Sequence, residues 1–222
     1  MPISQTRVTT AFSAQPGNST PDHLSGFHGE LVTADFAGKY YEQTARGNSF
    51  YVSTVVAGLA VPISTTTAPT VVLWNPSDSG YNAVLGRYTA SYVSGTSVAT
   101  SIGLNFKSRV GSVVDPVAGS SVEVFTQAAL GTNLFNGILG GGNASRMRSA
   151  ATATNTVTAG AWLRTLLGES ALIATTAMNP YGATYDFDGE LILPPGVMIF
   201  ATGAAASGAL LAQTLSWVEV PV

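Results

Sequence analysis

Residues 215–220 read Leu215-Ser216-Trp217-Val218-Glu219-Val220, and this stretch near the C-terminus decides the fold class. In an extended strand, successive side chains point to opposite faces, so the side chains at 215, 217 and 219 oppose those at 216, 218 and 220. Apolar residues stand in both sets. We therefore expect a strand with one side on a core and the other side on a neighbouring subunit, with Trp217, Val218 and Val220 as candidate interface residues.

Short runs of β-branched and aromatic residues, separated by turn formers, also occur through the part of the chain before this strand. Such spacing is typical of an all-β chain, and it predicts an antiparallel β-sandwich of the jelly-roll type. The predicted strands cover residues 50–56, 70–74, 84–93, 98–106, 122–125, 172–177, 190–193, 197–201 and 210–220.

The domain organisation follows from the point in the sequence at which these strand-like runs begin. Residues 1–48 show no sustained period and are predicted to form an extended N-terminal arm. Residues 49–222 are predicted to form the sandwich, with a long loop or excursion near 107–165 that is rich in Ala, Gly, Asn and Thr. Within it, residues 159–167 fit a helix or a further strand equally well. The turn formers of residues 75–80, Asn-Pro-Ser-Asp-Ser-Gly, predict a hairpin connection.

Composition excludes several function classes. Only 9% of the 222 residues are charged, against about 25% in an ordinary soluble domain. Nine Lys and Arg residues are too few for the basic face that nucleic acid requires. The chain has no cysteine, so it has neither disulfides nor thiolate metal sites. No stretch reads as a membrane span or a secretory signal, and we expect a product that stays in the compartment where it is made.

Candidate chemistry is sparse. His23 and His28 stand near acidic residues, but no third convergent ligand accompanies them. Residues 186–190 read Asp-Phe-Asp-Gly-Glu, a run that fits calcium binding or a glycosidase carboxylate pair. The Asp188-Gly189 pair favours a plain turn that leads into a strand. We therefore expect no catalytic residue, no metal site and no cofactor.

Candidate contact residues fall in two further places. The first is the end of the arm, where aromatic residues fit docking on a partner as well as core packing: Phe36, Tyr40, Tyr41 and Arg46. The second is the excursion, where Arg146, Met147 and Arg148 form the nearest approach to a basic patch. Two arginines of this kind fit a carboxylate or a neighbouring chain, but the pattern favours two solvated arginines on either side of a methionine.

Residues 71–85 (Val-Val-Leu-Trp-Asn-Pro-Ser-Asp-Ser-Gly-Tyr-Asn-Ala-Val-Leu) and 91–96 (Ser-Tyr-Val-Ser-Gly-Thr) resemble a pattern in structural proteins of tailed bacteriophages. The endings 193–196 and 217–222 are similar too, as is the Tyr-rich stretch before the first strand. The resemblance covers most of residues 40–222, and its motifs are turn and strand patterns. Where the pattern often has Lys after the turn glycine, this chain has Tyr81.

The resemblance implies a virion component, namely a jelly-roll homotrimer that decorates or cements a capsid. The implied partners are further copies of the chain and the major capsid protein, with neither nucleic acid nor membrane, and the implied location is the capsid surface. Two alternatives stay open: a virion appendage or receptor-binding module that contacts a host ligand, and, more distantly, a carbohydrate-active enzyme using Asp186, Asp188 or Glu190.

Overall fold

The structure is a computed structural model that describes residues 40–63, 69–96, 98, 100–107, 134–150, 160–169 and 182–222. These residues form one short helix and twelve strands: α1 (Tyr41–Ala45), β1 (Ser49–Ser53), β2 (Leu59–Ala60), β3 (Val72–Trp74), β4 (Tyr81–Ser94), β5 (Thr100–Lys107), β6 (Leu134–Asn136), β7 (Arg148–Ala150), β8 (Ala161–Glu169), β9 (Gly182–Asp186), β10 (Ile192–Leu193), β11 (Met198–Gly203) and β12 (Leu210–Pro221).

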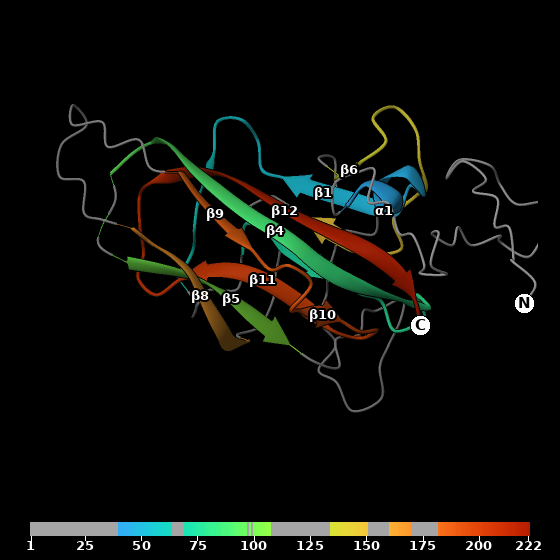
Figure 1. Ribbon diagram of the computed structural model, residues 1–222. Coiled ribbons are helices and arrows are strands. Elements are labelled where there is room, and N and C mark those ends of the chain that lie inside the picture. Colours follow the sequence, from blue (N-terminus) through green and yellow to red (C-terminus); the bar gives the residue numbers. More distant parts are fainter. Residues whose placement is uncertain are drawn as a thin grey trace, which may run out of the picture.

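The strands build two antiparallel sheets that pack face to face (Figure 1). The large sheet has the order β10-β4-β12-β1-β6, with β2 also paired to β12 and β9 also paired to β4. The small sheet has the order β7-β3-β11-β5-β8. The predicted all-β antiparallel sandwich is therefore confirmed.

Strands β4 and β12 form the longest ladder, and a β-bulge interrupts it between Leu215 and Trp217. The side chain of Ser216 occupies this irregularity, where its Oγ accepts a hydrogen bond of 2.8 Å from the backbone N–H of Arg87. Gly86 lies opposite, and a Cβ at this position would come within 2.8 Å of the same Oγ. A side chain at position 86 would therefore collide with the Ser216 hydroxyl unless the Ser216 side chain moved.

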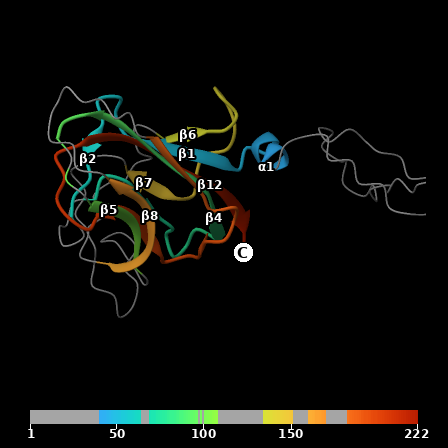
Figure 2. The same cartoon turned by 60° about the vertical axis from the view of Figure 1, so that its left-hand side comes forward.

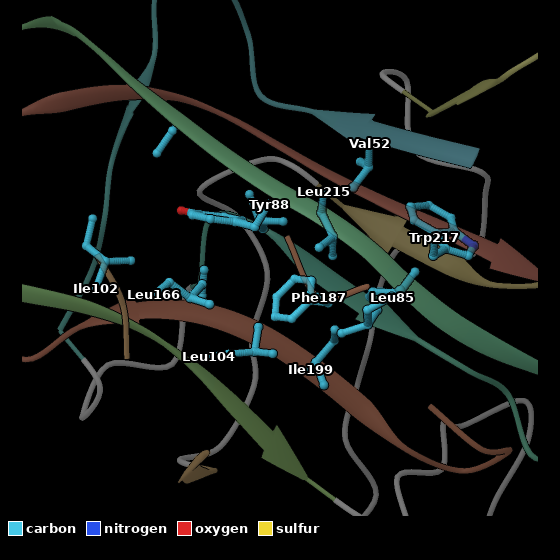
Figure 3. Close-up of a cluster of buried hydrophobic side chains, with 14 of the residues drawn as sticks. Val52, Leu85, Tyr88, Ile102, Leu104, Leu166, Phe187, Ile199, Leu215 and Trp217 are labelled. Carbon is cyan, nitrogen blue, oxygen red and sulfur yellow. The ribbon is translucent and has the colours of Figure 1, made fainter. Parts of the chain in front are cut away.

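The core lies between the two sheets, as Figure 3 shows. Phe50 and Trp217 stack in it with ring centroids 6.0 Å apart. Leu215, Trp217 and Glu219 all point inward and are buried, so the predicted alternation of this strand is confirmed. Trp217 has no exposed surface, and the prediction that it contacts a neighbouring subunit is wrong because its ring fills the core. On the opposite face, Val218 is also buried, whereas Val220 is 38% exposed.

A buried polar network crosses the same core. The hydroxyl of Tyr88 donates to Oε1 of Gln213 at 2.8 Å, and Nε2 of Gln213 donates to Oγ1 of Thr70 at 3.2 Å. All three side chains are about 1% exposed. Since buried polar atoms are costly unless they are paired, this network fixes the segment before β3 against the large sheet.

The turn at residues 75–80 joins β3 of the small sheet to β4 of the large sheet, so the predicted hairpin connection is wrong. The reason is Asn75, which is fully buried. Its Nδ2 donates to the backbone oxygens of Tyr81 (2.7 Å) and Leu193 (2.8 Å), and its Oδ1 accepts from the Ser79 hydroxyl at 2.5 Å. These bonds turn the chain from one sheet to the other.

The excursion contributes strands to both sheets. Strand β6 pairs with β1 in the large sheet and β7 pairs with β3 in the small sheet. The ambiguous residues 159–167 fall largely in β8, which is a strand and not a helix. The first strand begins at Ser49, where the predicted sandwich begins, and α1 lies within the predicted arm. The predicted strands at 122–125 and 172–177 lie outside the described residues.

We predict that Asn75→Ala lowers the free energy of unfolding by about 2–3 kcal/mol, because it leaves buried backbone carbonyls without their donor. Chemical denaturation measures this change. Asp78→Ala, at an exposed position of the same turn, is the matched control and should change little. Equal effects of the two substitutions would show that Asn75 does not hold the corner.

Candidate functional site

At one end of the sandwich, α1 and the loop that follows β6 lie close together (Figure 2). Its side chains come from both segments that the sequence marked as contact candidates, the end of the arm and the excursion. Tyr41 is 44% exposed, Ile138 37% and Leu139 87%, and Arg46 and Arg146 are exposed as well. We call these five residues the end surface: Tyr41, Arg46, Ile138, Leu139 and Arg146.

Two asparagines hold the loop against the chain after α1. Asn136 donates from Nδ2 to the backbone oxygen of Gly47 at 2.7 Å, and Asn143 donates to the backbone oxygen of Arg46 at 3.0 Å. Gly47 has a φ of +73°, and a Cβ there would lie 3.0 Å from the backbone nitrogen of Asn143. The two backbones can approach this closely only with glycine at position 47.

The buried carboxylate of Glu219 fixes the far side of the loop. It accepts hydrogen bonds from the Ser145 hydroxyl (2.5 Å) and from the backbone N–H of Arg146 (2.9 Å). The indole Nε1–H of Trp217 also donates to it at 3.3 Å. Glu219 is only 3% exposed. Because a buried carboxylate must be satisfied by donors, the loop and β12 are held together as one unit.

A polar hollow of about 340 Å³ opens beside Glu219. The Arg146 guanidinium lies above the Tyr81 ring, 5.1 Å from its centroid, at this hollow. A cation over an aromatic face is attracted by the ring quadrupole, so the Tyr81 ring helps to hold the Arg146 guanidinium in this position. The hollow is lined by Asn48, Phe50, Tyr81, Asn143, Ala144, Ser145, Arg146 and Glu219.

The predicted basic patch divides into three different environments. Arg146 is exposed, Met147 is 1% exposed and packs in the core, and the half-buried Arg148 lies 5.9 Å from the centroid of the Trp74 ring. The prediction that Met147 is a loop contact is wrong, since Glu219 holds the neighbouring backbone and turns the Met147 side chain inward. Arg146 is the member of this group that belongs to the end surface.

Three of the four predicted arm contacts, Tyr40, Tyr41 and Arg46, lie within the described residues. Tyr40 is half-buried, and its hydroxyl donates to Oδ1 of Asp186 on β9 at 3.4 Å. Tyr41 and Arg46 are exposed members of the end surface. Phe36 lies outside the described residues.

The acidic run 186–190 forms the plain turn that the sequence favoured. Asp188 and Gly189 have φ values of 49° and 83°, and the N–H of Glu190 donates to the carbonyl of Phe187 at 2.7 Å. Two consecutive positive φ angles are the mark of a type I′ turn. Asp186 pairs with Arg87 at 2.8 Å, and Glu190 pairs with Arg164.

The Arg87 guanidinium, by hydrogen bonding to Asp186, is the main cause that lowers the pKa of this carboxyl below its ordinary value, and the backbone N–H of Asp188 adds to the effect. An acid or base for glycoside hydrolysis usually has a pKa close to the working pH. The pKa of Asp186 is lowered, whereas the general acid of a glycosidase has a raised pKa. Its geometry is that of a structural ion pair on the outer face of the sheet.

Within the ranges that the structure describes, no three His, Asp or Glu side chains gather as a metal-binding group. In the same ranges no helix has the length and apolar character needed to cross a membrane. His23 and His28 lie outside these ranges.

Comparison of the chain with protein-family models, with curated proteins and with solved structures finds no match.

Three side chains that hold the loop of the end surface in place were not predicted from the sequence: Asn136, Asn143 and Glu219. The signal for Glu219 was present: a glutamate occupies an inward position in an alternating strand, between buried residues, where a charge requires donors. No comparable signal marks Asn143, because its partner, the backbone of Arg46, lies 97 residues away.

We predict that Glu219→Ala lowers the free energy of unfolding by about 3 kcal/mol or more, since several buried donors lose one acceptor. Glu219→Gln should cost less, because one carbonyl oxygen is kept. Glu190→Gln, which removes an exposed glutamate from a surface ion pair, is the control and should change little. Thermal and denaturant unfolding measure all three, and a Glu219→Ala variant as stable as the control would contradict the role of Glu219.

Proposed function

We propose that this chain is a non-enzymatic structural protein of a tailed-bacteriophage virion. In this proposal it is a capsid decoration or cement protein that binds the head shell as a homotrimer and stabilises it. Its partners are further copies of itself and the major capsid protein, and it lies on the capsid surface. The resemblance of residues 71–85 and 91–96 to phage structural proteins suggests the class.

The observation that carries the proposal is the end surface. Exposed apolar side chains, Ile138 and Leu139, stand at the tip of a loop that Asn136, Asn143 and Glu219 hold in place. A surface that is held rigidly before binding loses little conformational entropy on association. Such a surface suits contact with another protein.

The charge-poor composition supports the same proposal. Interface cores between proteins are depleted of charged residues, and this chain has only 9% of them. Binding to many equivalent positions of a shell also multiplies a modest affinity for each single contact. A ligand that binds only the assembled shell stabilises that shell by mass action.

We also infer that the sandwich is a jelly roll. One sheet contains β1-β12-β4-β9 as successive neighbours, and the other contains β3-β11-β5-β8. Along the chain these eight strands pass repeatedly between the two sheets, and the last strand returns beside the first, as two interleaved Greek keys require. In this assignment β6 and β7 are additions in the connection between β5 and β8.

A second function, a receptor-binding module of the virion, is favoured by one observation. A hollow of about 150 Å³ on the outer face of the large sheet is lined by Tyr40, Tyr51, Arg87 and Ser216, among others. Aromatic faces beside a few polar groups are the chemistry of a small polar ligand. The two functions depend on different surfaces, since this hollow does not include the end surface.

We predict that the purified chain cosediments with empty head shells of its phage, and that Leu139→Asp weakens this binding at least about tenfold. Burial of a leucine contributes about 1.5–3 kcal/mol, and 1.4 kcal/mol already corresponds to a factor of ten. Val56→Asp, at a residue of the β1–β2 connection that is 92% exposed, is the matched control. A wild-type chain that leaves the shells unbound would refute the proposal.

A further inference from the structure

An apolar groove opens on the side of the sandwich where β8 and β10 lie. Its volume is about 290 Å³, and it is lined by Leu85, Phe106, Leu163, Leu191, Ile192, Leu193, Pro194, Val197 and Ile199. Leu85 and Ile199 belong to the core, so the groove is the place where the core reaches the surface. Ile192 is 57% exposed, Leu163 41% and Phe106 36%.

Strand β8 forms one wall of this groove and is the last strand of the small sheet within the described residues. An edge strand presents a row of backbone N–H and C=O groups that can pair with another strand. Trp162, beside Leu163 on this strand, is 39% exposed. The groove therefore combines apolar side-chain pockets with a backbone edge, which is the combination that an extended peptide satisfies.

The chain itself supplies a segment of this kind. Residues 1–39 precede the described part, and at about 3.3 Å per residue they reach about 130 Å when extended. In an extended conformation Val8, Thr10 and Phe12 share one face, and residues 1–20 carry a single charge, Arg7. The described chain begins at Tyr40, whose hydroxyl contacts Asp186 at the end of β9. In the sequence, Asp186 comes shortly before Leu191, Ile192 and Leu193, which line the groove.

We propose that residues 6–13 of one copy bind as an added strand along β8 of a neighbouring copy, with Val8 and Phe12 in the apolar groove. This inference rests on the proposed self-association and names the contact that carries it. Edge pairing with backbone hydrogen bonds supplies affinity, and the alternate apolar side chains supply the register. The added strand also covers an edge and an apolar opening that otherwise invite uncontrolled association.

Disulfide trapping in the full-length chain tests this contact, because the chain has no cysteine of its own. Phe12→Cys is made in one preparation and Leu163→Cys in another that carries a different tag, and the two are mixed and oxidised. We expect the mixed disulfide to exceed the control by about tenfold or more, since a bound segment brings the thiols to millimolar effective concentration. The control pairs Phe12→Cys with Val56→Cys, at a residue that is exposed elsewhere.

Two further experiments make the result specific. Ile192→Cys replaces Leu163→Cys as a second groove position, so that a folding defect in one variant does not decide the outcome. A synthetic peptide of residues 1–20 should lower the yield of the mixed disulfide, whereas the same peptide with Val8→Asp and Phe12→Asp should not. Equal yields for the groove and control pairs would overturn the inference.

Light scattering on the same wild-type protein separates the two proposals. An oligomer without the mixed disulfide overturns the groove contact alone and leaves self-association standing. A monomer without the mixed disulfide overturns both. Shell binding that persists when the mixed disulfide is absent overturns the groove contact alone and leaves the shell contact at the end surface standing.

Discussion

The fold depends on the way its chain passes from one sheet to the other. Each such passage leaves backbone polar groups at a corner, and without disulfides the corners must be held by packing and hydrogen bonds. Asn75, Gln213 and Glu219 do this with side chains that are at most 3% exposed. Each of them bonds to a segment far away in sequence, so the sandwich is braced by buried polar groups as well as by its apolar core.

Polar side chains also hold the exposed loop after β6 in place. The loop after β6 projects Leu139 into solvent while Glu219 and two asparagines hold its base. The apolar groove, by contrast, lies beside β10, and β6 and β10 are at opposite ends of the large-sheet order. In the proposed function, one edge of a subunit can therefore contact the shell while the other edge receives a neighbouring copy. Two separate surfaces are what a multivalent assembly requires.

Much of the sandwich could be predicted from short-range patterns. The alternation of residues 215–220 correctly divided them into two opposite faces without showing which face is buried, and the Asp188-Gly189 pair gave the correct turn, because both signals lie within a few residues. The turn at Asn75 was predicted as a hairpin because its residues are the same turn formers. What directs it to the other sheet is the bond from Asn75 to Leu193, 118 residues away. Trp217 was misplaced because an exposed interface and a core position share one alternating pattern.

In the proposed function the chain assembles into a homotrimer. The measurement that tests it is the native mass of the purified full-length chain, by light scattering coupled to size exclusion. For a homotrimer we expect a mass near three times 22.7 kDa that does not fall when the protein is diluted. A mass of 22.7 kDa would contradict it, because a monomer has no neighbouring copy to fill the groove beside β8.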